Sequence, residues 1–443
     1  MYKFRNFPPI NALINDKSLD VYPLYLKNYF AKLVVSNCKK QLSKNPNLEF
    51  SFETLSLKIK ETIDEFLISQ PKSLINATGV IIHTNLGRSI IDESAFDEIK
   101  NIICSYSNLE FNLQNGKRGS RYDAISANLK ILFSCEDCLV VNNNASAVFL
   151  ILNTLAKDYE VITSRSELVE IGGSFRVPEV INAAGVLLKE VGTTNKTHLK
   201  DYENAISANT KIILKTHRSN FAFKGFFEEV CLEQIYTLAK KKKIVSYYDL
   251  GSGWCENLNK TLAKNEPCVK DLLKHCDILS FSGDKLFGST QAGIILGKKK
   301  YIQKLKKNQL LRMLRVDKIT LALLNQTTKA YLQKEYEKIP TLKLLNDDIK
   351  TIEKKALFVK ENIHIPCEFK KSKSLVGGGS MPDKTLESMI LSFKGKALNL
   401  QENFRKNGVI GRIEKDEFVL DFRTILDKDL NKLIDIINKV FHA

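Results

Sequence analysis

Three polar residues occur in an order that suits one kind of chemistry: Asn220, Asp249 and Lys285, at intervals of 29 and 36 positions. A lysine amine can attack an aldehyde and hold it covalently. A carboxylate can keep a pyridine nitrogen protonated, which makes the ring an electron sink, and an amide can hydrogen-bond a phenolic oxygen. Pyridoxal 5'-phosphate (PLP) needs these groups from a protein. The sequence therefore predicts a PLP site with Lys285 as its covalent anchor.

Short apolar runs place two of these residues near the ends of predicted strands. Asp249 ends the run at residues 244–249, and Lys285 follows the run at residues 276–282. A third run, at residues 291–297, comes directly afterwards. In open α/β sheets, sites form at the carboxyl ends of strands. The pattern favours a functional Lys285 over the alternative, a lysine that is simply solvated in a surface loop.

A PLP site also needs a cradle for the phosphate group. Residues 142–148, Asn-Asn-Asn-Ala-Ser-Ala-Val, follow a predicted strand at 139–141 and open a predicted helix at 148–156. Small residues at a helix start leave backbone N–H groups free, and the helix dipole favours an anion there. Asn144 or Ser146 could cap this helix and also bind the phosphate. Plain N-capping without a ligand is the alternative.

Arginines occur in three groups that suit an oxyanion. Arg88 lies in a turn after an apolar run. Arg312 and Arg315 are three positions apart, which would put both guanidinium groups on one face of a helix. Two such planar groups side by side match a phosphate-like anion, although a solvated basic helix is the alternative. A glycine-containing turn carries Arg118 and Arg121, which are further candidates for substrate binding.

Composition limits the class of protein. The chain has 443 residues and is 44% hydrophobic, which is enough for two or three domains. Its net charge of +17 suggests a nucleic-acid partner, although lysines solvated on every face would give the same value. No apolar run approaches 18 residues and the first residues lack a signal peptide's apolar core, so no membrane partner is expected.

Cysteine usage points to the cytoplasm. Nine cysteines, an odd number in a long chain, do not make a disulfide framework and favour a reducing compartment. Cys135 and Cys138 form a lone CxxC motif, with no second pair at the spacing of a zinc site. Both are expected to be ordinary buried thiols, and no metal site is predicted.

Hydrophobic periodicity divides the chain into three predicted parts. Residues 1–70 have helical spacing, most clearly at 21–34 and 52–67, and predict a small helical domain. Residues 71–300 alternate apolar runs with amphipathic stretches, which predicts a large PLP-binding domain whose mostly parallel sheet is wrapped by helices. Residues 301–443 begin with a long helical stretch and continue as a small α+β domain. The predicted fold class is α/β.

Several of these segments together resemble one family. The chain is similar to bacterial selenocysteine synthase, L-seryl-tRNA(Sec) selenium transferase, from about residue 70 to 385. The resemblance implies PLP-dependent fold type I, the aspartate aminotransferase fold. One departure is Phe287-Gly288-Ser289-Thr290, where relatives often carry Leu-Gly-Gly-Pro, and it bears on loop geometry. The similar segments are Leu74–Ser89, Gly116–Tyr122, Glu167–Arg176, Asp249–Gly253, Ser282–Gly288, Leu311–Lys318 and Gly377–Pro382.

The resemblance also implies roles for individual residues. It implies Lys285 as the PLP lysine and Asp284 beside it as a catalytic carboxylate. It implies that Arg88, Arg312 and Arg315 bind the selenium donor. It further implies a tRNA-binding N-terminal domain and a homodecamer, a ring of five dimers in which two subunits build each active site.

These inferences predict one reaction and leave two alternatives. L-seryl-tRNA(Sec) would undergo PLP-dependent β-elimination to aminoacrylyl-tRNA, and selenium from selenophosphate would then be added to give L-selenocysteinyl-tRNA(Sec). One alternative is a PLP-dependent lyase or desulfurase acting on a free small amino acid; the N-terminal domain and the three arginines argue against it. The other is a non-catalytic tRNA-binding relative, against which the intact Lys285 and Asp249 argue.

Overall fold

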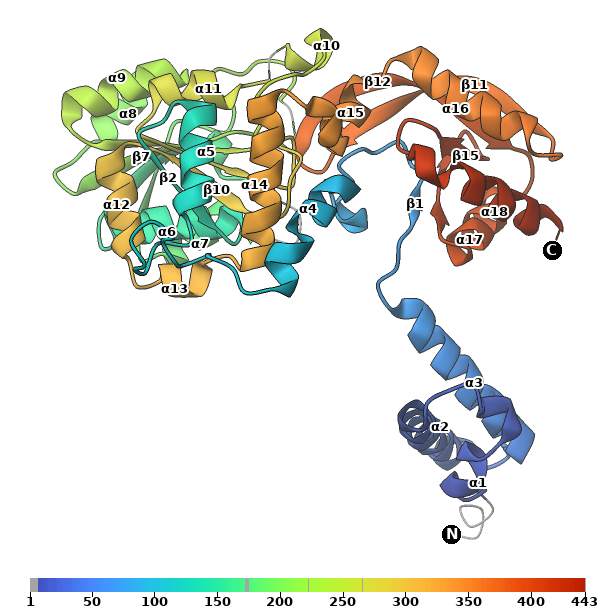
Figure 1. Cartoon of the computed structure of the whole chain (residues 1–443). Helices are drawn as coiled ribbons and strands as arrows, with labels where there is room; N and C mark the ends of the chain where they lie inside the picture. The colour runs from blue at the N-terminus through green and yellow to red at the C-terminus, as the bar shows by residue number, and fades with distance from the viewer. Residues whose placement is uncertain (1–6, 172–174, 222, 265, 443) are drawn as a thin grey trace. The chain divides into compact units, whose positions relative to one another are not determined.

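The computed structural model describes residues 7–171, 175–221, 223–264 and 266–442. The chain forms two compact units, Met1–Ser73 and Leu74–Ala443 (Figure 1). The segment Glu167–Arg176, which carries part of the family resemblance, includes residues 172–174, and these lie outside the described ranges. All the candidate PLP- and donor-binding residues belong to the second unit.

The first unit is a small helical domain. Ser51 starts its third helix by accepting a hydrogen bond from the Thr54 N–H, as an N-cap does. Side chains from all three helices form a core of their own, which includes Leu13, Phe30 and Ile59. The helices expected within residues 1–70 are therefore present, with the bounds α1 (Ile10–Ile14), α2 (Leu24–Lys44) and α3 (Phe52–Ser69).

The second unit contains a seven-stranded sheet. Strand β10 runs antiparallel to both of its neighbours, β2 and β9, and all the other neighbouring pairs are parallel. The α/β class with a mostly parallel sheet is thus confirmed. In spatial order the strands are β2 (Asp137–Val141), β10 (Gly293–Gly297), β9 (Ile278–Ser282), β8 (Val245–Gly251), β7 (Thr210–Thr216), β3 (Glu160–Ser164) and β6 (Leu187–Val191).

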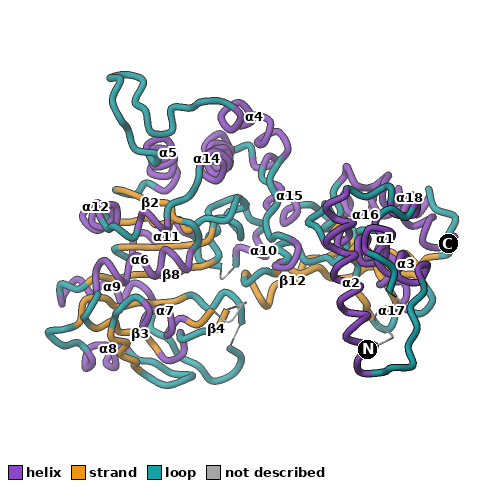
Figure 2. Tube along the Cα trace, turned by 90° about the horizontal axis from the view of Figure 1, so that it is seen from below, coloured by secondary structure: helices purple, strands orange, loops and turns teal. Residues whose placement is uncertain are grey.

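Helices pack around this sheet (Figure 2). Helix α6 contacts β2, β7, β9 and β10, so it covers the middle of the sheet. A short antiparallel pair, β4 (Glu170–Ile171) and β5 (Phe175–Arg176), lies outside the main sheet. The helices are α4 (Glu93–Cys104), α5 (Asp123–Phe133), α6 (Asn144–Ala156), α7 (Val177–Ala183), α8 (Leu199–Ala205), α9 (Leu232–Lys242), α10 (Lys260–Ala263), α11 (Val269–Leu272), α12 (Lys299–Lys307), α13 (Leu311–Leu314), α14 (Lys318–Gln333) and α15 (Pro340–Asn346).

The hydrophobic core of the large sheet continues beyond residue 300. Leu324, Tyr331 and Leu345 belong to the same buried cluster as the strand residues Leu139 and Ile295. The long helical stretch expected after residue 300 is three helices, α12 to α14, and α14 packs against α4 and α5. These helices therefore help to position the site and do not only link two domains.

The C-terminal part has a second core around a four-stranded antiparallel sheet, in the order β11-β12-β15-β14. Residues 75–76 also contribute to this part of the molecule, because the short strand β1 pairs in parallel with β13. The elements are β1 (Ile75–Asn76), α16 (Ile349–Glu361), β11 (Cys367–Gly377), β12 (Ser380–Phe393), α17 (Ala397–Lys406), β13 (Val409–Ile410), β14 (Arg412–Glu414), β15 (Glu417–Asp421) and α18 (Leu430–His442).

The hairpin between β11 and β12 connects the C-terminal sheet with the catalytic candidates. Its tip, Gly377–Gly379, has positive φ at all three glycines. A β-carbon on Gly379 would lie 3.4 Å from Lys285 Nζ, and one on Gly378 would collide with the Ile82 carbonyl oxygen. Only glycine allows this left-handed path at so close a distance. The described helices include none that is both long and apolar enough to cross a bilayer.

Candidate active site

Lys285 lies in the loop after β9 and is buried, with 5% of its surface exposed. Its amine faces Gly251 and Gly379, the two places where a β-carbon would come within 4 Å of Nζ. Burial lowers the pKa of Lys285, and the nearby Arg88 cation lowers it further. The Ser89 hydroxyl donates a 2.7 Å hydrogen bond to the Lys285 carbonyl oxygen, which fixes the backbone at this point.

Asp249 lies near the carboxyl end of β8 and is 4% exposed. Burial raises the pKa of its carboxyl group to about 6, even though Asn144 donates a hydrogen bond to it that acts in the opposite direction. The bond from Asn144 Nδ2 to Asp249 Oδ1 is 2.7 Å long. The His217 N–H donates to the Asp249 carbonyl oxygen at 2.8 Å. Asp249 is thus a buried acid with a fixed orientation.

We predict opposite effects of Asp249→Asn on stability and on turnover. The pKa of Asp249 is higher in the folded protein than in the unfolded chain, so this residue reduces stability as pH rises from about 4 to about 6. The neutral amide avoids this cost. In cofactor-free protein, the variant should be up to about 3 kcal/mol more stable at pH 8 and nearly equal near pH 4, as measured by urea unfolding. Turnover should fall strongly, because an amide does not favour a protonated pyridine ring. Equal stability at pH 8 would contradict the buried-carboxylate account.

The start of α6 differs in detail from the sequence-based expectation. The N-cap is Asn143, whose Oδ1 accepts a 2.8 Å hydrogen bond from the Ser146 N–H. Neither Asn144 nor Ser146 caps the helix, because the backbone is extended at Asn143 and α6 already begins at Asn144, so both residues lie in its first turn. Asn144 instead reaches Asp249, and its buried Oδ1 has no hydrogen-bond partner in the described chain. Phosphate binding by Asn144 and Ser146 stays a prediction.

Asn220 lies in the loop after β7, close to the glycine hairpin. Its Nδ2 donates a 2.9 Å hydrogen bond to the Glu170 carbonyl oxygen. Its Oδ1 is buried and has no partner among the described residues. A β-carbon on Gly379 would contact both Asn220 Cβ and Lys285 Nζ, at 3.9 and 3.4 Å. The fold therefore brings Asn220, Asp249 and Lys285 to the same end of the sheet.

Arg88 and Asp284 form an ion pair beside the lysine. Arg88 Nη1 lies 2.8 Å from Asp284 Oδ2, and the Asp284 carboxylate is largely buried while Arg88 is about one-third exposed. The turn that carries the arginine has left-handed backbone at Gly87 and Arg88. The Ser89 N–H donates to the Asp284 carbonyl oxygen at 3.2 Å. The 87–89 turn and the loop around Lys285 are thus joined through both backbone and side chains.

The other four arginine candidates line one pocket of about 280 Å³. Arg118 and Arg121 are both paired with Glu110. In the described ranges, Arg312 and Arg315 form no ion pair with a carboxylate. The expectation that these two share a helix face is wrong, because α13 ends at Leu314 and Arg315 has extended backbone. They line a common pocket through the turn that follows the helix. The pocket-lining arginines are Arg118, Arg121, Arg312 and Arg315.

Two backbone contacts place this arginine pocket next to the start of α6. The Asn142 N–H donates to the Leu314 carbonyl oxygen at 2.9 Å, one residue before Arg315. Arg121 Nη1 donates to the Val316 carbonyl oxygen at 2.9 Å, one residue after it. Because Asn144 reaches Asp249 from the same helix start, a chain of direct contacts links the arginine pocket to Asp249.

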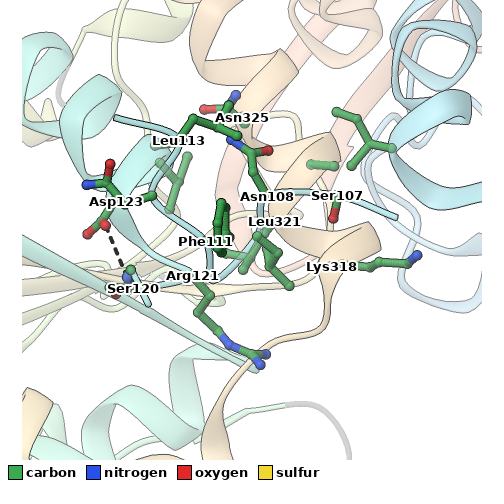
Figure 3. Close-up of a pocket in the computed structure, with 17 residues that line it drawn as sticks. Ser107, Asn108, Phe111, Leu113, Ser120, Arg121, Asp123, Lys318, Leu321 and Asn325 are labelled. Carbon is green, nitrogen blue, oxygen red and sulfur yellow. Dashed lines mark hydrogen bonds between the residues drawn. The ribbon is translucent and has the colours of Figure 1, made fainter. Parts of the chain in front are cut away.

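The turn that carries Arg118 and Arg121 rests on an apolar hollow of about 300 Å³. Figure 3 shows Phe111 and Leu321 in this hollow, with the Arg121 guanidinium pointing away from them. The Ser120 N–H donates to Asp123 Oδ2 at 3.1 Å, the dashed line in the figure. Packing on one side and hydrogen bonding on the other direct the arginines toward the pocket that contains Arg312 and Arg315.

Comparison with known proteins decides the family. The model of the family described as L-seryl-tRNA selenium transferase matches residues 74–426. The chain belongs to this family. It is 79% identical to the L-seryl-tRNA(Sec) selenium transferase of Campylobacter lari over all of both chains, and 64% identical to that of Campylobacter jejuni, strain 81116, over 99% of each. The Aliarcobacter butzleri protein of the same name is 48% identical, again over the whole of both chains.

Solved structures add evidence on the fold alone. A D-glucosaminate-6-phosphate ammonia-lyase superposes with a TM-score of 0.60 over 84% of this chain and 96% of its own, at 15% identity. At this identity the similarity concerns architecture. It agrees with an α/β fold built on a mostly parallel sheet.

This member of the L-seryl-tRNA selenium transferase family departs from the pattern of its relatives at residues 287–290. This segment is firmly packed. Phe287 is buried and stacks on Tyr331 of α14, with 4.9 Å between ring centroids. Ser289 shares a 2.9 Å hydrogen bond with the Thr327 hydroxyl of the same helix. Helix α14 therefore holds the loop that follows Lys285, and the departure leaves the lysine's position fixed.

Some residues that build the site escaped sequence reasoning. Asn143 lies in the segment singled out for the phosphate, but three consecutive asparagines gave no way to choose the cap. Ser89 follows Arg88 directly, and nothing in its sequence context indicates that it anchors Lys285. Gly379 belongs to the segment Gly377–Pro382, whose resemblance to the family does not indicate a contact with Lys285. Its run of three glycines was the available signal for a close backbone approach.

Proposed function

We propose that this protein converts L-seryl-tRNA(Sec) to L-selenocysteinyl-tRNA(Sec), with PLP as cofactor and selenophosphate as selenium donor. Full-length similarity to relatives named for this activity, up to 79% identity, carries the proposal. The site supports the proposal independently, because a buried lysine, a buried carboxyl group and an amide lie together at the ends of β7, β8 and β9.

The residues present fit PLP. Lys285 is a buried amine with a lowered pKa, which makes it a good nucleophile toward an aldehyde. Asp249 is a buried acid that forms no ion pair with a described residue, and it is suited to a pyridinium nitrogen. The unpartnered buried oxygens of Asn144 and Asn220 indicate that these amides are not fully satisfied by the protein alone. We propose that these residues, with the first turn of α6 and Ser146 for the phosphate, hold the cofactor.

The protein's own groups would then perform the remaining tasks. Bound PLP would supply an electron sink for the pair released when a C–H bond next to the substrate amine breaks. Lys285 is suited to accept that proton, because burial and Arg88 favour its neutral form. Asp284, held by Arg88, keeps a carboxylate next to Lys285. The buried loop and the glycine hairpin limit access of water to the lysine.

The arginine pocket supports a donor-binding role. Arg312 and Arg315 have no carboxylate partner in the described ranges, so their guanidinium groups are available to an oxyanion. We propose that they bind selenophosphate, with Arg88 contributing from the side of Asp284. Arg118 and Arg121, already paired with Glu110, would add positive charge near the same anion.

We predict that Arg312→Ala and Arg315→Ala each lower kcat/KM for selenophosphate by at least about tenfold. A charge-assisted hydrogen bond contributes roughly 1.5–3 kcal/mol, and about 1.4 kcal/mol corresponds to a factor of ten. Loss of the serine hydroxyl should continue, because donor binding comes later. Steady-state kinetics with varied donor and rapid-quench analysis of seryl-tRNA would separate the two steps. Arg405→Ala, an exposed arginine on α17, serves as control. Normal donor kinetics with a blocked first step would contradict the assignment.

One experiment tests the proposed function directly. Purified protein with PLP is incubated with seryl-tRNA(Sec) and selenophosphate, and the aminoacyl group is analysed after release from the tRNA. Selenocysteine is the expected product. Elimination from free L-serine without any change in seryl-tRNA(Sec) would favour a lyase, and the absence of both reactions in PLP-loaded protein would favour a non-catalytic relative.

Assembly, location and domain roles are part of the same proposal. We propose a cytoplasmic homodecamer of five dimers, as the resemblance implies, with residues 1–70 binding tRNA. Helix α2 presents exposed apolar side chains at helical spacing, Tyr25, Tyr29 and Leu33, which would suit a partner surface. We assign residues 71–300 to the PLP-binding domain, and residues 301–443 to the helices and the small sheet that complete it.

A further inference from the structure

A short turn beyond β7 exposes two consecutive phenylalanines. Phe226 is 79% exposed and Phe227 is 45% exposed. The turn has a defined backbone: the Phe226 carbonyl oxygen accepts a 2.9 Å hydrogen bond from Asn195 Nδ2, and the Glu228 N–H donates to the Asn195 carbonyl oxygen at 2.9 Å. A fixed turn that holds two large apolar rings in solvent indicates a surface that binds a ligand or a partner.

Cations lie over these rings. Lys196 Nζ is 3.7 Å from the centroid of the Phe226 ring. The Arg218 guanidinium carbon lies 4.9 Å from the centroid of Phe223 and 6.0 Å from that of Phe227. Aromatic rings interleaved with Lys and Arg are the pattern of surfaces that bind single-stranded nucleic acid, where bases stack on rings and cations meet the phosphates.

The turn also borders the candidate active site. Phe227 lines a pocket of about 360 Å³ together with His217, Tyr248 and Pro382. His217 donates its N–H to the Asp249 carbonyl oxygen, and Pro382 lies just after the glycine hairpin that approaches Lys285. Phe226 directly precedes Phe227 but is not among the residues lining this pocket. A ligand in the pocket could therefore continue outward along the two rings.

Charge balance indicates which part of the substrate fits here. Lys215 is paired with Glu167 at 2.6 Å, and Arg218 is paired with Glu229 at 2.8 Å. Two of the cations that line this pocket are thus neutralised by carboxylates of the protein, unlike Arg312 and Arg315. An anionic selenium donor would gain little electrostatic binding energy in this pocket. A neutral aromatic base would lose little solvation free energy on entering it.

We propose that Phe226 and Phe227 stack the 3'-terminal bases of the seryl-tRNA, with the terminal base on Phe227. The inference rests on the proposed function. Serine is esterified to the terminal ribose, so the base on that ribose must lie within one nucleotide of the reacting carbon. Phe227, at a pocket that adjoins Asp249, lies where such a base is required. Lys196, which is paired with the exposed Glu228 at 3.7 Å, would exchange this partner for the phosphate that follows.

The test compares Phe227→Ala and Phe226→Ala with the wild type in steady-state turnover of seryl-tRNA(Sec). Loss of a stacked base weakens binding by about five- to a hundredfold. We expect KM for seryl-tRNA to rise within that range for Phe227→Ala, with kcat, KM for selenophosphate and the absorbance of bound PLP nearly unchanged. Phe227→Tyr should restore KM, because it keeps the ring. Phe358→Ala on α16, a phenylalanine with similar exposure of 42%, is the matched control.

A modified substrate makes the assignment specific. For the wild type, KM should be higher by a similar factor with a seryl-tRNA whose terminal nucleotide lacks its base. For Phe227→Ala, KM should be nearly the same with and without this base, because the substitution and the missing base remove the same interaction. Additive effects of the two changes would overturn the assignment of the terminal base to Phe227.

Two further outcomes would overturn the inference and leave the proposed function intact. If the wild type turns over and KM is unchanged in both alanine variants, the rings do not bind the substrate. If the variants lose subunit assembly, measured as particle mass, while KM per active site stays normal, the rings form a contact between copies of the chain. Failure of the wild type to convert seryl-tRNA would instead count against the proposed function itself.

Discussion

Replacing Lys285 by alanine is expected to abolish turnover and to remove the absorbance of covalently held PLP. The Lys285 amine is the group proposed to bind the aldehyde covalently, and general acid–base catalysis by a side chain alone contributes roughly 10²–10⁴-fold. The fold should survive, because burial of the Lys285 amine reduces the stability of the folded protein. The pKa of Lys285 is lowered by burial and by Arg88, which shows that the charged amine is disfavoured there. A thermal melting temperature equal to or above that of the wild type in cofactor-free protein would agree with this account.

A second buried lysine provides the control. Lys355 in α16 is also buried and pairs with Asp427 at 3.0 Å in the C-terminal part of the molecule. Lys355→Ala should lower the melting temperature, since it removes the cation 4.0 Å from the largely buried Asp347 carboxylate and the hydrogen bond to the Ile425 carbonyl oxygen. It should retain PLP absorbance and turnover. Wild-type absorbance and activity in the Lys285→Ala protein would show that the cofactor lysine lies elsewhere.

The strands of the large sheet could be predicted because their sequence signal is local. Buried parallel strands are continuous apolar runs, and Asp249 and Lys285 stand out because each interrupts or follows such a run. The parallel strand ends then meet at one edge of the sheet, so Asp249 and Lys285 could be placed together from the sequence. The confirmed fold class rests on the same local signal.

The contacts that complete the candidate site are not local, and sequence reasoning could not supply them. Arg88 reaches Asp284 across 196 positions, and Gly379 approaches Lys285 across 94 positions of chain. At the end of α13, the Leu314 carbonyl oxygen accepts a hydrogen bond from the Asn142 N–H at the start of α6, a contact that the residues of the helix do not reveal. Helix periodicity alone therefore overextended α13 and misplaced Arg315.

The N-terminal unit has the physical features of an independent module. Its core, which includes Leu13, Phe30 and Ile59, is formed entirely within residues 1–73. Its charge is only mildly basic, with ten Lys and Arg against seven Asp and Glu in residues 1–70. Phosphate attraction carries little sequence information, so a module with this charge would discriminate between tRNAs mainly by shape and specific contacts.

Deletion of residues 1–70 is accordingly expected to leave PLP bound and to weaken tRNA(Sec) binding greatly, with loss of its preference over tRNA(Ser). The cofactor candidates all lie in the second unit, so the absorbance of bound PLP should persist. Binding of both tRNAs would be measured for the full and shortened chains at several salt concentrations. In the full chain, salt should weaken the binding of both tRNAs, while the ratio of their affinities changes much less.

The triple change Tyr25→Ala, Tyr29→Ala and Leu33→Ala should reproduce much of the loss of tRNA binding if the exposed face of α2 makes the contact. Unchanged discrimination by the shortened chain would move tRNA recognition to the basic surfaces of the second unit, around Lys240 on α9 or Lys298 before α12.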